Sequence, residues 1–452
     1  MKFLFSVILL AAVINLQKIY SADTTASAYT HALMEIQNKN YDAAINLLDQ
    51  YLSLYTKSKE GFFQRGNAYY EKGDYNSAIT DYEKASELEY ENPELYYKLG
   101  LAYLKRKDYQ GSINSQKAAI WLNPDYAEAY AQLGDLYTAV KNYKRAQDYY
   151  RIAIDLEQNL PHVWLMLGET SLGLNENEEA IVYYKKAVEL KPNDINYYYS
   201  AGLAFYIVKD TVNAINFLNK TIELDRNFAE GYYTLARIYS DLKNYSSSIY
   251  NYSKAIEVEK SGLSPSVLYT ERGIVNKKYG DYANAMKDLD FAISVNADDT
   301  LAYLTRGKIY LESDNDSLAY EDFLVALMLD SSNSSCLTYM GMLYLSRGQN
   351  DSALLRLNRA IELAPRDANT LYAMGNLYFN QENYQNAIRY YDKALNADKD
   401  FIVVYENRGI SYYNLRFFRQ AAADFENAMK YNPSLTDKLK PFYIDAKVKG
   451  GM

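Results

Sequence analysis

Apolar side chains recur every third or fourth residue along most of this chain, in short stretches separated by polar turns. This period matches one face of an α-helix and predicts a succession of amphipathic helices. In residues 62–85, FFQRGNAYYEKGDYNSAITDYEKA, two such stretches flank the turn sequence KGD. Asp74 ends this turn, and an aspartate in that place is a good N-cap for the second helix. The basic element is therefore a pair of short helices joined by a tight turn.

This two-helix unit repeats with a fixed period. A glycine recurs every 34 residues from Gly66 to Gly202 and again from Gly273 to Gly409, with a three-residue insertion between the two series. Ala32 and Ala236 hold the same place in the units that lack the glycine. Twelve units therefore span residues 25–434. We number the residues of each unit so that this small residue is position 8.

The repeated positions predict how the two helices of a unit pack. Position 20, on the second helix, is alanine or serine in every unit. Small residues at positions 8 and 20 let the helices approach closely, and the aromatic residues that prevail at positions 4 and 11 fill the space beside them. Because one unit cannot bury its apolar stripes alone, neighbouring units must stack.

The pattern resembles the tetratricopeptide repeat family over about nine-tenths of the chain. The resemblance implies an all-α fold, a right-handed α-solenoid superhelix of helix–turn–helix repeats, with the first helices lining a concave groove that binds partners. Some members of the family hold the C-terminal carboxylate of chaperones with a set of lysine, asparagine and arginine side chains from three consecutive units. No three consecutive units of this chain supply that set.

Two departures from the period suggest boundaries. The insertion EKSGLSPSV at residues 259–267 predicts a longer turn, so that residues 25–260 hold repeats 1–7, residues 261–267 the inserted turn and residues 268–434 repeats 8–12. The insertion either divides the stack there or is absorbed in one rigid, continuous stack. Residues 435–452 predict a C-terminal capping helix and tail, with the helix interrupted near Pro441.

The N-terminus has the composition of a signal peptide. Lys2 precedes an apolar run over residues 3–16, and the small residues Ser21 and Ala22 offer a cleavage site. We therefore expect residues 1–22 to direct export, which makes the protein periplasmic or secreted; an uncleaved anchor is the alternative. No later segment is apolar for long enough to cross a bilayer, so no stable membrane insertion is expected after cleavage.

Composition and motifs narrow the functional classes. The 452 residues carry a net charge of −9, which argues against non-specific nucleic-acid binding. With one cysteine, Cys336, and two histidines, the chain lacks the usual means for a metal site or a catalytic triad. No phosphate-binding loop or nucleophile elbow occurs either. We expect neither enzymatic activity nor a cofactor or metal.

Arginine replaces the usual apolar residue at position 7 in four units. In those four units, and in no others, position 23 on the second helix is aspartate. This coincidence predicts an ion pair between the two helices of each unit, structural in role, with two parallel hydrogen bonds. The predicted pairs are Arg65–Asp81, Arg272–Asp288, Arg306–Asp322 and Arg408–Asp424.

The chain holds 50 tyrosines, and many of them fall at positions 5 and 12, which the resemblance places in the groove. Aromatic rings there suit the binding of a protein or peptide segment. We expect the scaffold to be a monomer. Carbohydrate or cell-wall polymer binding is an alternative function, and packing between units is an alternative role for these rings. The predicted groove residues are Phe63, Tyr70, Tyr97, Tyr199, Tyr206, Tyr233, Tyr372, Phe379 and Tyr413.

The charge expected along the groove is uneven. Units 2–5 place acidic residues at positions 2 and 9, whereas units 7–9 place the basic residues Arg237, Lys277 and Lys308 there or nearby. An acidic stretch could favour a basic partner segment, although charges on exposed helix faces usually serve only solvation. The acidic residues are Glu60, Glu94, Glu128, Asp135 and Glu169.

Overall fold

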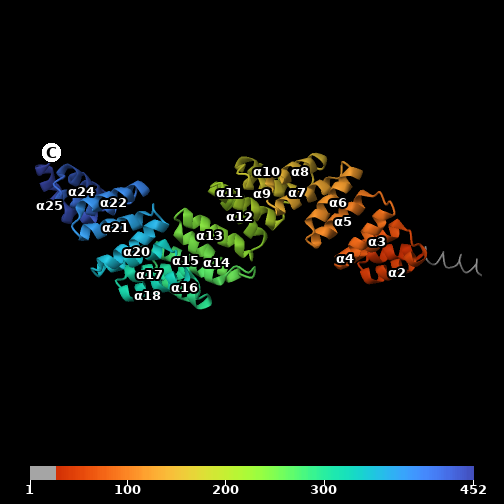
Figure 1. Cartoon of the computed structure of the whole chain (residues 1–452), viewed down its shortest axis with the longest axis horizontal. Helices are drawn as coiled ribbons and strands as arrows, with labels where there is room; N and C mark the ends of the chain where they lie inside the picture. The colour runs from red at the N-terminus through yellow and green to blue at the C-terminus, as the bar shows by residue number, and fades with distance from the viewer. Residues whose placement is uncertain (1–26, 452) are drawn as a thin grey trace, which may run out of the picture. The chain divides into compact units, whose positions relative to one another are not determined.

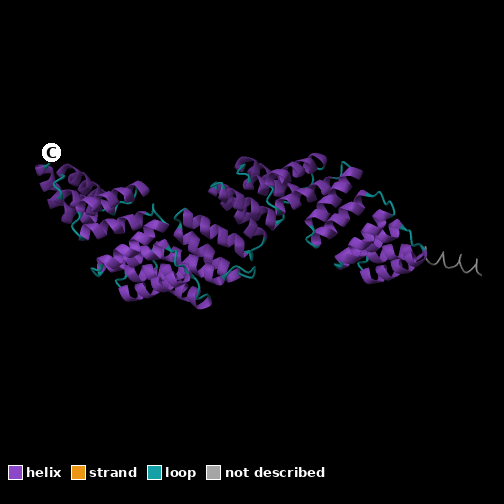
Figure 2. Cartoon of the chain, in the orientation of Figure 1, coloured by secondary structure: helices purple, strands orange, loops and turns teal. Residues whose placement is uncertain are grey.

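The computed structural model describes residues 27–451, and these residues form helices joined by turns and short loops (Figure 2). No strand occurs within that range. The predicted signal peptide, residues 1–22, lies outside the described residues. The prediction of an all-α solenoid of helix–turn–helix repeats is confirmed, because consecutive helices in each compact unit pack as hairpins.

The chain forms two compact units, which meet in the sequence between Asp225 and Arg226. Within the described residues of the first unit, six hairpins follow one another (Figure 1). They are residues 27–37 with α2 (Tyr41–Leu54), α3 (Lys59–Lys72) with α4 (Tyr75–Glu87), α5 (Pro93–Lys105) with α6 (Tyr109–Leu122), α7 (Ala127–Ala139) with α8 (Tyr143–Leu156), α9 (Pro161–Gly173) with α10 (Asn177–Leu190), and α11 (Ile195–Ile207) with α12 (Thr211–Leu224).

The second unit holds six further hairpins and a C-terminal helix, α25, so that the described chain has the twelve predicted repeats. The insertion at residues 259–267 lies inside this unit: residues 259–264 join α14 to α15, and residues 265–267, which the sequence placed in the inserted turn, form the start of α15. The helices are α13 (Ala229–Asp241) with α14 (Tyr245–Val258), α15 (Pro265–Tyr279) with α16 (Tyr282–Val295), α17 (Thr300–Glu312) with α18 (Asp316–Leu329), α19 (Ser334–Ser346) with α20 (Asn350–Leu363), α21 (Ala368–Asn380) with α22 (Tyr384–Ala397), α23 (Val404–Asn414) with α24 (Phe418–Tyr431), the 3₁₀ turn η1 (Pro433–Leu435) and α25 (Thr436–Lys449).

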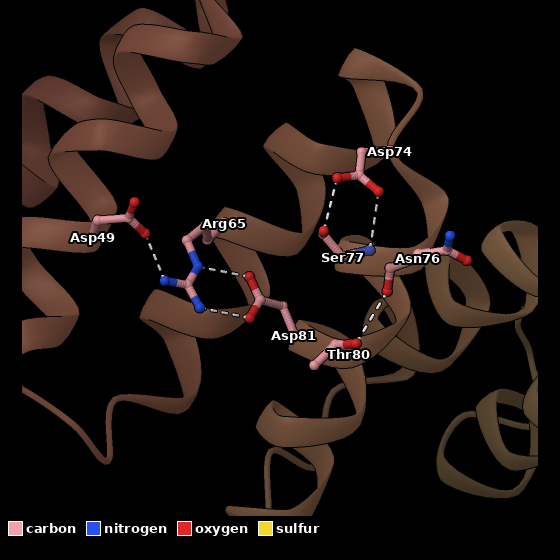
Figure 3. A network of polar contacts seen from close by, with 7 residues as sticks. All are labelled: Asp49, Arg65, Asp74, Asn76, Ser77, Thr80 and Asp81. Atoms are coloured by element: carbon pink, nitrogen blue, oxygen red, sulfur yellow. Dashed lines mark hydrogen bonds and ion pairs between the residues drawn. The ribbon is translucent and has the colours of Figure 1, made fainter.

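Each hairpin turns through a residue with left-handed backbone at position 15. The next residue, position 16, is the N-cap of the second helix. Figure 3 shows one example, in which the Asp74 carboxylate accepts hydrogen bonds from the backbone N–H of Ser77 at 3.2 Å and from its hydroxyl at 2.7 Å. Position 16 is asparagine or aspartate in nine units. Eight of these nine side chains accept such a backbone hydrogen bond, and Asn40 instead donates to Glu35. Three of the twelve left-handed residues are glycines, and the others are Lys39, Lys107, Lys141, Asn175, Lys209, Lys243, Asp314, Glu382 and Arg416.

Substitutions at position 15 test the left-handed turns, because replacing a glycine there should lower the stability and introducing one should raise it. Gly73 has a φ of 90°, and a Cβ atom added there would meet nothing within 4 Å, so Gly73→Ala changes only the backbone preference. We expect this substitution to lower the free energy of unfolding by about 1 kcal/mol. Lys107→Gly, at a φ of 62°, should instead raise it. Chemical denaturation followed by circular dichroism measures both, and a shift in the same direction for the two variants would contradict this account of the turns.

Position 8 and position 24 form the centre of each hairpin. The glycine of the first helix faces a large buried side chain of the second, so closely that a Cβ atom added to Gly134 would lie 2.3 Å from the Tyr150 ring. A Cβ atom added to Gly307 would likewise lie 2.6 Å from Phe323, and one added to Gly375 would lie 2.4 Å from Tyr391. The glycine therefore makes room for the ring, which explains why the small residue sets the period.

Helix α25 packs on α24 and buries Leu439 and Ala446 against the last hairpin. The expected interruption near Pro441 is wrong, because α25 continues through the proline. Pro441 lies in the second turn of this helix, where only one backbone hydrogen bond is lost.

Candidate functional site

The structure brings together all four arginine–aspartate pairs that the sequence predicts. In the first of them, Arg65 Nε and Nη2 each donate to one carboxylate oxygen of Asp81, both at 2.7 Å (Figure 3). Each of the other three pairs has the same two parallel hydrogen bonds, with distances between 2.6 and 2.9 Å. The pairs link the first and second helices of one hairpin, namely α3–α4, α15–α16, α17–α18 and α23–α24.

Each of these arginines also reaches the preceding hairpin, which the sequence analysis missed. The free Nη1 of Arg65 donates to Asp49 of α2 at 2.6 Å (Figure 3). Arg306 and Arg408 bind Asp290 and Asp392 in the same way, both at 2.7 Å. In the fourth case Arg272 donates to the hydroxyl of Ser253 at 3.0 Å. We call these contacts the arginine bridges, because each joins two successive hairpins.

A signal for the bridges was present in the sequence. The third partner always occupies position 25, and aspartate stands at position 25 only in units 1, 8 and 11, each of which directly precedes a unit with arginine at position 7. Comparing position 7 with the preceding unit, and not only with its own, would have revealed it.

Burial determines the electrostatics of the bridges. The side chains of Asp81 and Asp424 are 5% exposed, and this burial raises the pKa of both carboxyl groups against the opposing effect of their arginines. The hydrogen bond to Asp81 in turn raises the pKa of Arg65. Desolvation thus offsets much of the attraction, so the bridges are better regarded as devices that set hairpin packing than as a source of net stability.

The predicted groove residues lie on the first helices, but they differ in exposure. Phe63 is 3% exposed and packs against Tyr82 and Tyr90, so it belongs to the core. Tyr413 is covered by α25, where its hydroxyl donates to Asp445 and its ring meets Phe442. The others are half-buried: Tyr70, Tyr97, Tyr199, Tyr206, Tyr233, Tyr372 and Phe379.

The half-buried rings also make contacts inside the chain. Tyr97 packs edge-on against Tyr126, and Tyr372 packs against Tyr391 and Phe401. The hydroxyl of Tyr233 donates to Glu271 of the next hairpin at 3.0 Å. These rings therefore contribute to stacking between units, and only part of each ring is open to a partner.

The first helices of neighbouring hairpins lie side by side in each compact unit, for example α7 with α9 and α17 with α19. We define the first-helix face as the surface formed by positions 2, 5, 6, 9, 12 and 13 of successive units. On α17 these residues are Leu301, Leu304, Thr305, Lys308, Leu311 and Glu312.

On the first-helix face of the first unit, Asp135 of α7 joins three side chains. It accepts hydrogen bonds from the Tyr150 hydroxyl at 2.7 Å and from the Gln132 amide at 2.9 Å, and the Nε2 atom of His162 in α9 lies 3.1 Å from its Oδ1. The acidic residues Glu128 and Glu169 are exposed on the same face. The predicted acidic stretch is thus solvent-accessible, apart from the partly enclosed Asp135.

This cluster makes a pH prediction. The hydrogen bond with Asp135, together with its charge, raises the pKa of His162 above the usual 6.5. Because the pKa is raised on folding, the pair contributes its full stabilisation below pH 6.5, and that contribution is lost as the pH rises through the folded-state pKa. We expect an NMR titration of the ring, simplified because the chain has only two histidines, to show a raised pKa that falls toward 6.5 in Asp135→Asn. An unchanged value in the variant would show that Asp135 is not the cause.

Other kinds of site are not evident in the described residues. Residues 27–451 contain no group of three or more histidine, cysteine, aspartate or glutamate side chains placed to hold a metal ion. Within the same range, every helix is too short or too polar to span a bilayer. The thiol of Cys336 is buried, and this burial raises its pKa to about 12.

Family models for this kind of repeat match much of the chain. The model described as TPR repeat matches residues 66–107, 172–207 and 341–382. Two models described as tetratricopeptide repeat match residues 368–401 and residues 93–126, 127–160 and 229–261. Among curated proteins, none matches the chain.

Several solved structures are similar to parts of the chain. MamA is 27% identical over 39% of this chain and 96% of its own, with a TM-score of 0.36. Yeast Tom70 is 15% identical over 92% of this chain and 99% of its own, with a TM-score of 0.41. YrrB, described as a TPR protein with an unusual peptide-binding site, is 24% identical over 42% of this chain and 96% of its own, with a TM-score of 0.35.

Proposed function

Because the chain belongs to the tetratricopeptide repeat family, we propose that it is an exported scaffold that binds a segment of a partner protein on its first-helix face. In this proposal the chain acts as a monomer that binds a protein partner and has no enzymatic activity. It binds neither nucleic acid nor a cofactor. Within each compact unit, the packed hairpins hold this face ready, which lowers the entropic cost of binding.

The observation that carries the proposal is apolar side chains left exposed on the first-helix face of the second unit. Val267, Leu301 and Val403 all occupy position 2, and they are 43%, 47% and 50% exposed. Position 2 lies two turns from position 9 on the same side of a helix, and there the half-buried Met342 and Ile410 add further apolar surface. Apolar surface that recurs along one face is typical of protein-binding sites.

Export is supported by the N-terminal sequence, in which Lys2 precedes an apolar run. We expect the mature protein to be recovered outside the cytoplasm with its N-terminus close to residue 23. Cell fractionation followed by N-terminal sequencing tests this point. Recovery of intact Met1 in a membrane fraction would indicate the anchored alternative.

A photo-crosslinking comparison tests the binding face. A photoreactive phenylalanine analogue replaces Leu301 in one variant and Met328 in another, and the full chain is expressed in its native host. Both positions are exposed, at 47% and 74%, but Met328 lies on the second helix of the same hairpin. We expect discrete protein adducts from position 301 and none from position 328. Equal adducts from both positions, or adducts from position 328 alone, would exclude the first-helix face.

A further inference from the structure

Lys308 stands out on the first-helix face of the second unit as a cation without a counter-ion. It is half-buried at position 9 of α17, and its Nζ lies 4.7 Å from the centre of the Tyr339 ring on α19. Within the described chain, no carboxylate oxygen lies within the ion-pairing distance of 4.0 Å from this ammonium group. A cation–π contact holds the head in place, but it leaves the positive charge unneutralised.

An acidic residue on the same helix as Lys308 is already paired with another lysine. Glu312 follows Lys308 by one helical turn on α17, but its carboxylate pairs with Lys277 of α15 at 2.6 Å. A second acidic residue, Asp367 at the N-cap of α21, also acts on the Lys308 charge, but its carboxylate accepts hydrogen bonds from the backbone N–H and the hydroxyl of Thr370. Among the described residues, Lys308 therefore has no carboxylate of its own as an ion-pair partner. Desolvation, followed by repulsion from Lys277, lowers the pKa of Lys308, which is the response of a cation that lacks a partner.

Apolar side chains also lie on the first-helix face near Lys308. Leu301 lies seven residues earlier on the same helix and is 47% exposed, while Leu311 and Met342 are half-buried nearby along the face. A partner segment that packs on these side chains would bring Lys308 out of water. Because burying an unpaired charge is costly, such a segment is favoured if it carries a negative group at this point.

We propose that the first-helix face around Lys308 selects an apolar partner segment that carries an aspartate or glutamate side chain, and that this side chain pairs with the Lys308 ammonium. This inference rests on the proposed function and adds the chemistry of the partner to it. The carboxylate would give the Lys308 ammonium group the ion-pair partner that it lacks within the described chain, and the apolar neighbours would provide the contact area.

The test uses a library of random twelve-residue peptides displayed on phage as N-terminal fusions, so that no free C-terminal carboxylate is presented. The full chain and its Lys308→Met variant are screened in parallel. Lys287→Met, which removes an exposed lysine from the second helix α16, is the matched control. We expect the full chain and Lys287→Met to enrich apolar peptides containing an acidic residue, and Lys308→Met to lose the acidic preference while still enriching apolar peptides.

A double-mutant cycle with one enriched synthetic peptide gives the sharper result. Fluorescence polarisation should show that replacing the acidic residue by its amide weakens binding to the full chain about tenfold. The same change should have less than about a twofold effect on Lys308→Met, and Lys308→Arg should retain the preference. Enrichment without acidic residues, or an acidic preference that survives in Lys308→Met, would overturn the inference. Failure of every protein to enrich any peptide would instead count against the proposed function.

Discussion

Asp288→Ala is expected to lower the free energy of unfolding of the second unit by about 3–5 kcal/mol. The Asp288 side chain is 7% exposed, and it accepts both hydrogen bonds from Arg272 as well as one from Asn276 at 2.9 Å. Its removal leaves Arg272 with the Ser253 hydroxyl as its remaining polar partner among those the structure shows. A guanidinium that is largely buried without a carboxylate is the costly product of this substitution.

Asp81→Ala is the matched comparison and should cost less. Arg65 would keep the carboxylate of Asp49, which lies 2.6 Å from its Nη1, so the charge would remain paired. Chemical denaturation with circular dichroism gives the overall effect, and hydrogen exchange in α16 or α4 gives the local effect, because a stack of repeats need not unfold in one step. Equal losses for the two aspartates would show that the third partner does not matter.

The double variant Arg272→Leu/Asp288→Leu completes the test. If the pair is coupled, replacing both members by apolar residues should recover most of the stability that Asp288→Ala loses. Effects of the single and double substitutions that simply add would show that the two side chains act independently.

Tyr150→Ala is expected to lower the free energy of unfolding of the first unit by about 3–5 kcal/mol. The ring is fully buried and fills the space above Gly134, where a Cβ atom would lie 2.3 Å from it. Because the glycine and the ring are complementary, the truncation leaves a cavity that neither helix can fill without moving. Chemical denaturation of the full chain, with hydrogen exchange in α7 and α8 as the local measure, provides the value.

Tyr150→Phe separates the ring from its hydroxyl. This variant keeps the packing and loses the hydrogen bond to Asp135, so it should cost about 1 kcal/mol. The hydroxyl of Tyr391 donates to Asn376 at 2.7 Å in the same geometry, and Tyr391→Phe should behave alike. A loss in Tyr150→Phe as large as that in Tyr150→Ala would place the energy in the polar contact and contradict the role assigned to the ring.

The sequence by itself determined the hairpins, their turns and the composition of their cores. These features depend on residues close together in the chain: the period of 34, the N-cap at position 16 and the small residues at positions 8 and 20 of one unit. The sequence also identified the arginine–aspartate pairs within one hairpin, such as Arg65–Asp81, because both partners belong to the same unit and change together from unit to unit.

Only the tertiary structure decided what happens between hairpins. It showed that Arg65 donates a hydrogen bond to Asp49 of the preceding hairpin and that Phe63 is buried. It also showed that α25 covers Tyr413 and that Lys308 contacts the Tyr339 ring but has no carboxylate as an ion-pair partner in the described part of the chain. Each outcome depends on the offset and rotation with which one hairpin stacks on the next. A repeat pattern specifies which side chains occur at each position, but the distances across a stack are set by packing of many side chains together.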